Sequence, residues 1–201
     1  MPSEPGAHPM NEPKESPLRT HDVAVIVGSL RRESINRKLA TAITRVAPPS
    51  LRFRHLSLDE LPMYNGDLEG QRPEAVDRFT AECAAAEAFL IVMPEFNRSL
   101  PAVLKNAIDW GSKPMDRNVW RDKPVAMSGT SPGAIGTAVG QQHLRQIMGI
   151  LGASVLGGEA YLSFKPEMID AQGDFADAST RKFIADYMAR FSVFVDKLVG
   201  A

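Results

Sequence analysis

The chain has 201 residues, of which 44% are hydrophobic and 23% charged, and a formal net charge of −1. This is the composition of a globular protein with one core, and its balanced charge gives no general attraction to nucleic acid or to an anionic membrane. The single cysteine, Cys83, excludes an internal disulfide and favours a reducing compartment, and the four histidines lack the spacing of metal ligands.

Residues 1–20 have prolines at positions 2, 5, 9, 13 and 17 and almost nothing apolar to bury, so we expect a disordered or extended N-terminal arm. This segment lacks the apolar core of a secretory signal, and no uncharged run reaches the roughly 18 residues that a membrane helix needs. We therefore expect a cytoplasmic protein with one folded domain over residues 21–201.

Short apolar runs alternate with helical patterns along the rest of the chain. The apolar runs predict strands over residues 23–27, 51–58, 88–93, 124–127 and 154–156. Apolar spacing and prolines predict helices over residues 36–47, 73–82, 101–110, 136–151 and 179–199. This alternation is typical of an α/β fold with a parallel sheet and helices on both faces. Such sheets bind ligands beyond the carboxyl ends of their strands, so the loops after the first, third and fourth strands are candidate sites.

The loop after the first strand is rich in hydrogen-bond donors and runs directly into a helix. Its short polar side chains are Ser29, Ser34 and Asn36, and Arg31 adds a guanidinium group. Together with the free N–H groups of a helix N-terminus, they favour a dianionic phosphate. The segment matches neither GxGxxG nor GxxxxGK[ST]. The alternative is a solvated turn whose polar residues only cap the helix.

The loop after the third strand reads Pro94-Glu95-Phe96-Asn97-Arg98-Ser99-Leu100-Pro101. Its prolines predict a stiff backbone, which can present N–H and C=O groups to a planar heterocycle in a fixed geometry. Phe96 could form an apolar wall. Arg98 places a cation where an anionic co-substrate could dock. In the helix that follows, Lys105 and Asp109 have the spacing of a structural ion pair.

The segment after the fourth strand, Gly129-Thr130-Ser131-Pro132-Gly133, matches the GxSxG pattern of serine hydrolases. Pro132 lacks the N–H that an oxyanion hole would need from the residue after the serine. The only later histidine is His143, and no acidic residue lies between it and Ser131. The glycines instead allow the backbone to approach a planar ring closely.

Three segments together resemble the NADPH-dependent FMN reductase family, and within it the branch that reduces chromate and quinones. They are Gly28-Ser29-Leu30-Arg31 with Ser34 and Asn36, Pro94-Glu95-Phe96-Asn97-x-Ser99-x-Pro101, and Leu104-Lys105-Asn106-Ala107-Ile108-Asp109-Trp110. The resemblance runs from Val23 to the last helix. It implies a flavodoxin-like three-layer sandwich with five parallel strands in the order 2-1-3-4-5, holding FMN without a covalent bond.

The resemblance also implies where FMN would bind. It assigns the phosphate to Ser29, Arg31, Ser34, Ile35 and Asn36. It assigns the isoalloxazine ring to Ser131 and, largely through backbone groups, to Pro94, Glu95, Phe96 and Asn97. Phe96 stands where the family usually has tyrosine, so a phenolic hydrogen bond is missing. Arg98 lies at a variable position and is our candidate for binding substrate.

The implied activity is that of an NAD(P)H-dependent oxidoreductase in which FMN carries the chemistry and no side chain acts as acid or base. Hydride would pass from NADPH or NADH to the flavin and then, in a ping-pong cycle, to a quinone, an azo compound, free flavin or an oxyanion such as chromate. Residues 61–69 resemble a loop near the family's dimer contact, which predicts a homodimer or homotetramer. The alternatives are an electron-carrier flavodoxin, a serine esterase acting through Ser131, and a flavin-free interaction module.

Overall fold

The computed structural model of the protein describes residues 19–200, so the expected N-terminal arm lies outside the described residues except for Arg19 and Thr20. The strands are β1 (His21–Val27), β2 (Leu51–Leu56), β3 (Ala88–Val92), β4 (Pro124–Ser131), β5 (Ser154–Val155) and β6 (Tyr161–Ser163). The first five form a parallel sheet in the order β2-β1-β3-β4-β5. The expected flavodoxin-like strand order is therefore confirmed.

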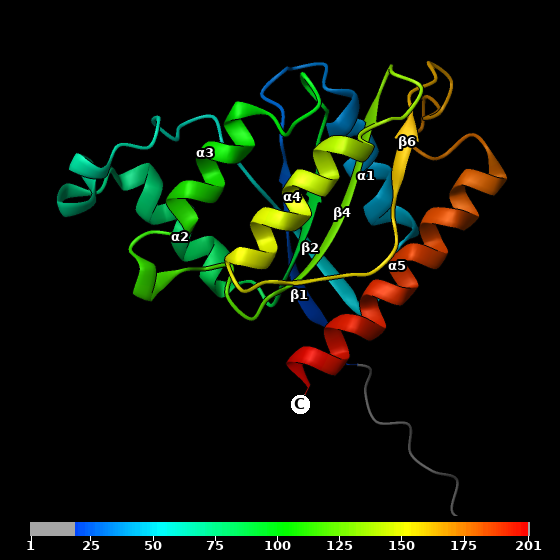
Figure 1. Ribbon diagram of the computed structural model, residues 1–201. Helices are drawn as coiled ribbons and strands as arrows, with labels where there is room; N and C mark the ends of the chain where they lie inside the picture. The colour runs from blue at the N-terminus through cyan, green and yellow to red at the C-terminus, as the bar shows by residue number, and fades with distance from the viewer. Residues whose placement is uncertain (1–18, 201) are drawn as a thin grey trace, which may run out of the picture.

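Helices cover both faces of this sheet (Figure 1). They are α1 (Ile35–Val46), α2 (Glu74–Ala85), α3 (Ala102–Gly111), α4 (Ala138–Ile150) and α5 (Ala178–Val199), with short 3-10 helices η1 (Gly66–Gln71) and η2 (Met115–Arg117). α1 and α5 pack on one face, and α2, α3 and α4 pack on the other. None of the helices in the described residues is long and apolar enough to cross a membrane.

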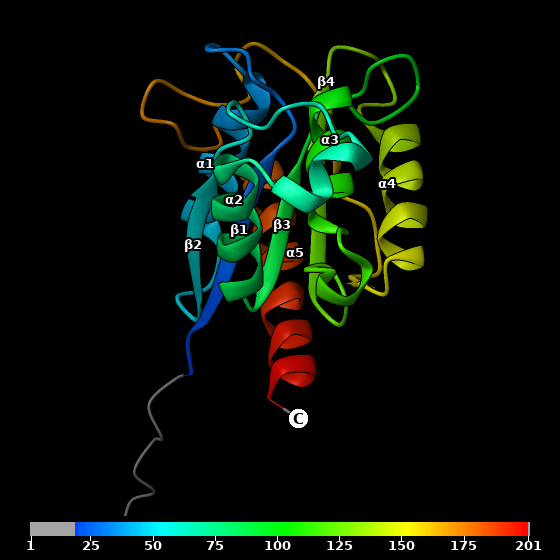
Figure 2. The same ribbon diagram turned by 90° about the vertical axis from the view of Figure 1, so that its left-hand side faces the viewer.

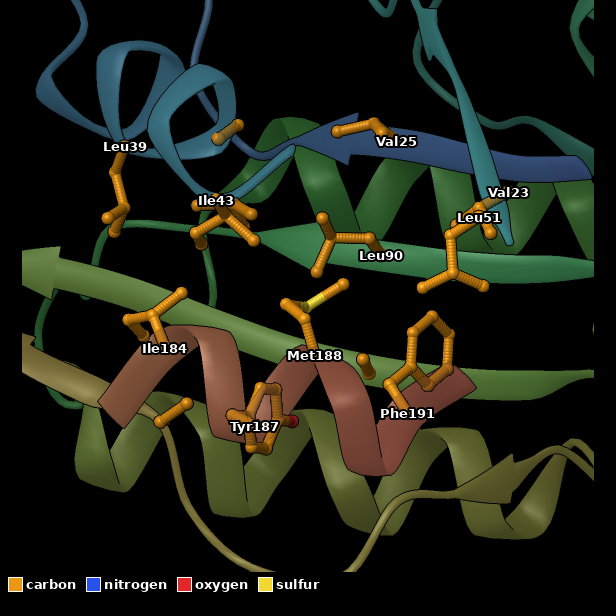
Figure 3. Packing of buried hydrophobic residues seen from close by; sticks show 14 of the residues in the cluster. Val23, Val25, Leu39, Ile43, Leu51, Leu90, Ile184, Tyr187, Met188 and Phe191 are labelled. Carbon is orange, nitrogen blue, oxygen red and sulfur yellow. The ribbon is translucent and has the colours of Figure 1, made fainter. Parts of the chain in front are cut away.

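The central strands have apolar side chains on both faces because both faces are covered. All five residues of β3 are buried, and successive side chains alternate between the two layers. Leu90 belongs to the cluster under α1 and α5, whereas Phe89 and Ile91 belong to the cluster under α2, α3 and α4. Figure 3 shows Leu90 facing Met188 of α5. This packing fixes the strand ends from which the candidate loops emerge.

β4 is longer than expected, and this corrects one sequence prediction. The expected strand ends at residue 127, but β4 continues to Ser131 because β6 pairs with Gly129, Thr130 and Ser131 in parallel register. The first half of the GxSxG segment is therefore strand and not loop. β6 (Tyr161–Ser163) itself was not predicted, because it is a strand through its pairing with the distant end of β4.

The loops after β1, β3 and β4 meet at one end of the sheet. In Figures 1 and 2 they lie together at the top, opposite the C-terminal end of α5. This is the carboxyl end of the parallel strands, where such folds bind ligands. The fold thus brings the three candidate segments to one edge.

Candidate functional site

The β1–α1 loop presents hydrogen-bond donors that nothing else in the described residues uses. Ser34 is the N-cap of α1, and its Oγ accepts a hydrogen bond from the Arg37 backbone N–H at 3.3 Å. The backbone N–H groups of Ile35 and Asn36 have no acceptor within residues 19–200. The side chains of Ser29 and Arg31 also make no hydrogen bond or ion pair there. A helix N-terminus with an added hydroxyl and guanidinium is a donor set suited to a dianionic phosphate.

Asn36 faces inward and joins α1 to β4. Its Nδ2 donates to the Thr130 carbonyl at 3.0 Å, and its Oδ1 accepts from the Thr130 N–H at 2.9 Å. β3 ends at Val92, so the amide takes the place of a neighbouring strand beside the end of β4. What Asn36 can offer a phosphate is therefore its backbone N–H and not its side chain.

The β3–α3 loop is a tight hairpin. Phe96 and Ser99 exchange two backbone hydrogen bonds of 3.0 and 2.9 Å across a two-residue turn. Asn97 and Arg98 form the turn with φ angles of 50° and 63°, as a type I′ turn requires. The stiffness predicted from the two prolines thus has a second source in this hairpin.

Glu95 links this hairpin to α4. Its side chain is only 6% exposed, and its Oε2 accepts a hydrogen bond of 2.8 Å from the Gly140 N–H in the first turn of α4. Arg98 lies beside it, with Nη1 3.6 Å from Glu95 Oε1. A carboxylate at a helix N-terminus is stabilised by the helix dipole. The Glu95 side chain is therefore engaged within the protein, so a ligand can use only the backbone of this residue.

A cavity of about 310 Å³ lies between the hairpin and the β4–α4 loop. It is lined by Glu95, Asn97 and Arg98 from the hairpin and by Ser131, Gly133, Ala134, Ile135 and Gly136 from the second segment. Gly136 has a φ of 57°, and a Cβ there would lie 2.9 Å from the Leu162 carbonyl oxygen, so only glycine fits. The structure thus brings Ser131 and Arg98, far apart in sequence, to one cavity.

The comparisons with known proteins identify the family. The sequence profile described as NADPH-dependent FMN reductase matches residues 21–167. The chain belongs to this family. It is 42% identical over 174 residues to a 2-hydroxy-1,4-benzoquinone reductase from Burkholderia sp, covering 86% of this chain and 95% of the relative. It is 41% identical over 179 residues to a quinone reductase from Pseudomonas putida, covering 88% and 96%.

A solved structure of a flavoenzyme has the same fold. The flavoenzyme NAD(P)H:(acceptor) oxidoreductase FerB from Paracoccus denitrificans superposes with a TM-score of 0.85 at 38% sequence identity, covering 89% of this chain and 98% of that one. The protein is thus an NAD(P)H-dependent oxidoreductase with FMN as its cofactor.

The residues at this edge of the sheet fit FMN in their chemistry. The phosphate of FMN is dianionic, and the β1–α1 loop offers the uncommitted donors of Ser29, Arg31 and the first turn of α1. A planar ring needs a space bordered by backbone groups, and the cavity between the hairpin and the β4–α4 loop is such a space. Phe96 is 56% exposed beside it and Ile135 is 43% exposed in its wall. Sequence reasoning missed Ile135 and Ala134, although an apolar residue in a glycine-rich loop was a usable signal.

The serine-hydrolase alternative finds no support in the geometry. Ser131 Oγ accepts a hydrogen bond from the Gly133 N–H at 3.3 Å. His143 is hydrogen-bonded elsewhere, with its Nδ1 3.1 Å from Ser99 Oγ. Within residues 19–200, Ser131 therefore has no histidine in the position that would activate it as a nucleophile.

Proposed function

We propose that residues 21–201 form one FMN-binding domain with its cofactor across the three loops. The phosphate is bound by Ser29, Arg31 and Ser34 and by the backbone N–H groups of Ile35 and Asn36. The ring lies in the 310 Å³ cavity, against the backbone of Pro94, Glu95, Phe96 and Asn97 and near Ser131. The uncommitted donors of the β1–α1 loop support the phosphate assignment, and the hairpin geometry supports the ring assignment.

We further propose that the protein reduces quinones with electrons from NAD(P)H. Bound FMN supplies the hydride-transfer chemistry, in a ping-pong cycle in which both substrates use one face of the ring. The single observation that carries this proposal is that the lining of the cavity that holds the ring combines the apolar Ile135 with the cation of Arg98. A flat, weakly polar quinone suits such surroundings when it stacks on the ring. The names of the two bacterial relatives, both quinone-type reductases, point to the same class of acceptor.

Arg98 is the residue that we assign to substrate docking. Its side chain is 68% exposed and its Nη1 lies 3.6 Å from Glu95 Oε1, so it lies at the rim of the cavity without being buried. A cation there attracts the phosphates of the nicotinamide co-substrate or an oxyanion acceptor such as chromate. Azo compounds and free flavin are the other acceptors in this proposal.

One experiment tests the reaction. The purified protein is loaded with FMN and mixed anaerobically with NADPH, and then with a benzoquinone. We expect the flavin absorbance to be lost with NADPH and restored by the quinone at turnover rates. Failure to take up FMN would contradict the cofactor site. FMN uptake without reduction by NADPH would instead favour an electron carrier.

We also propose that the protein is a homodimer or homotetramer, because a ring held by short loops of one small domain leaves one face uncovered. The residue 61–69 loop supports this proposal. It is fixed to α3, since Asn106 Nδ2 and Trp110 Nε1 both donate to the Pro62 carbonyl, at 2.9 and 2.8 Å. Met63 nevertheless remains 72% exposed. Light scattering on the native protein and on Met63→Glu tests this, and a fully active native monomer would contradict it.

A cytoplasmic location completes the proposal. It rests on cysteine usage, since Cys83 is a free and fully buried thiol. Burial raises its pKa, so the thiol stays protonated and unreactive. Fractionation of cells that express the full chain tests the location.

A further inference from the structure

A second and larger cavity lies on the other side of the β1–α1 loop. It has a volume of about 590 Å³ and extends from Ser29 and Leu30 along α1 to the end of β2. It shares no lining residue with the 310 Å³ cavity. We call it the β2 groove, and its charged and polar lining includes Arg32, Arg37, His55, Ser57 and Asp59.

Two arginines in the β2 groove have no partner within residues 19–200. Neither Arg32 nor Arg37 makes a side-chain hydrogen bond or an ion pair there. Other arginines of the chain do, since Arg52, Arg72 and Arg78 each contact a carboxylate. Two unneutralised guanidinium groups on one concave surface form a site for an anion with several oxygens.

The Arg37 charge acts on the other polar groups of the groove. Burial, and then the Arg37 charge, lower the pKa of His55. A hydrogen bond from Ser57 is the main cause that lowers the pKa of Asp59, and Arg37 contributes to it. Asp59 is therefore a carboxylate at neutral pH. A site for inorganic phosphate would not need this acceptor, whereas a ligand with a hydroxyl donor and an anionic group can use both Asp59 and the arginines.

We propose that the β2 groove binds the 2′-phosphoadenosine part of NADPH. In dinucleotide-binding α/β folds, a carboxylate near the end of the second strand binds a free ribose 2′-hydroxyl, and an arginine there instead accommodates a 2′-phosphate. Here Arg32 and Arg37 provide the guanidinium groups, and Asp59, which follows β2, can accept only from the 3′-hydroxyl, because the 2′-oxygen carries the phosphate. At Ser29 and Leu30 the groove reaches the β1–α1 loop. The inference rests on the proposed function, and it makes Arg37 a determinant of NADPH over NADH.

The test uses the FMN-loaded enzyme and 2′,5′-ADP, which has the phosphoadenosine but no nicotinamide. Calorimetry should give a dissociation constant about tenfold weaker for Arg37→Gln than for the native protein, as expected for losing one charged hydrogen bond. Lys38→Gln is the matched control, because it removes the same charge from the next residue of α1. Lys38 lies 3.7 Å from Glu33 and does not line the groove, so binding should be unchanged.

Several results would overturn the inference. The first is that Arg37→Gln and the native protein bind 2′,5′-ADP equally well. The second is that Lys38→Gln loses as much affinity for 2′,5′-ADP as Arg37→Gln does. The third is that the native protein binds 5′-ADP or inorganic phosphate as tightly as 2′,5′-ADP. Arg32→Gln should repeat the loss seen at Arg37. FMN content and thermal unfolding confirm that each variant is folded.

Kinetics separate this inference from the proposed function. With benzoquinone as acceptor, Arg37→Gln should lower the ratio of kcat/KM for NADPH to that for NADH by about tenfold, with NADH turnover retained. An unchanged ratio would contradict the groove assignment alone. Absence of turnover with either nucleotide in the native enzyme would contradict the proposed function, while the calorimetry would still decide on the groove.

Discussion

The loops after β1 and β3 lie at the same edge of the sheet but use their polar groups in opposite ways. In the β1–α1 loop, the Ser29 and Arg31 side chains and the first N–H groups of α1 have no partner within the described residues. In the β3–α3 hairpin, the backbone groups of Phe96 and Ser99 are hydrogen-bonded to each other, and the Glu95 carboxylate accepts a hydrogen bond from the first turn of α4. The first loop keeps its donors available for a ligand, whereas the hydrogen bonds of the hairpin fix its own backbone.

This difference corresponds to the two ends of FMN. A phosphate is compact and charged, so it is bound most strongly by several uncommitted donors converging on one point. A flavin ring is broad and flat, so it needs walls that do not move. Substitutions in the first loop should therefore act on cofactor binding, whereas substitutions that loosen the second should act on stability and on substrates.

Asn36, in the first turn of α1 just after the β1–α1 loop, is the exception, because its side chain is hydrogen-bonded to the Thr130 backbone. Asn36→Ala should have the largest effect on stability, since it leaves the buried N–H and C=O of Thr130 without partners. At about 1–3 kcal/mol for each unsatisfied group, we expect the free energy of unfolding to fall by about 3 kcal/mol. Urea denaturation of the FMN-free protein measures this. Lys38→Ala on the exposed side of the same helix serves as control. An equal, small change in both variants would show that the hydrogen bonds between Asn36 and Thr130 contribute little to stability.

Arg31→Ala tests the donor role of the first loop. Its guanidinium has no partner in the described residues, so its loss should leave the unfolding midpoint of the FMN-free protein unchanged. FMN binding should weaken by about 1.5–3 kcal/mol, the range for a hydrogen bond between charged groups. Fluorescence titration of FMN measures the dissociation constant. If that constant does not change, Arg31 is a solvated residue and the phosphate assignment loses its main side chain.

The sequence predicted most of the fold, because buried strands and amphipathic helices carry their periodicity locally. What it missed depends on distant partners. β6 exists as a strand through its pairing with β4, and the same pairing extends β4 to Ser131. The hydrogen bonds of the Asn36 side chain could not be predicted, because its partner, Thr130, lies 94 residues away in the sequence. The Lys105–Asp109 pair was predicted correctly, with Nζ and Oδ1 2.5 Å apart, because both residues lie on one helix.

Glu95→Ala breaks the link between the hairpin and α4. The Gly140 N–H loses its acceptor and Arg98 loses its neighbouring carboxylate, so we expect a loss of about 1–2 kcal/mol in stability. Glu95→Gln retains an acceptor for Gly140 and should lose about half as much. FMN affinity should change less than in Arg31→Ala. Thermal and urea unfolding of the two variants distinguish the hydrogen bond to Gly140 from the ion pair with Arg98. Identical stability of both variants would contradict a stabilising role of that hydrogen bond.

Arg98→Gly combines the smallest stability effect with a functional cost. Type I′ turns favour glycine where this chain has Arg98 at a φ of 63°. Removing the side chain relieves that conformation, so we expect the protein to gain about 0.5–1 kcal/mol in stability. If Arg98 docks substrate, the KM for NAD(P)H or for an anionic acceptor should rise, while a neutral quinone is less affected and FMN affinity holds. Arg98→Ala loses the same charge and retains the backbone strain, so it should share the KM change without the gain in stability. Unchanged kinetics in both variants would remove Arg98 from the site and leave its unfavourable turn without a functional reason.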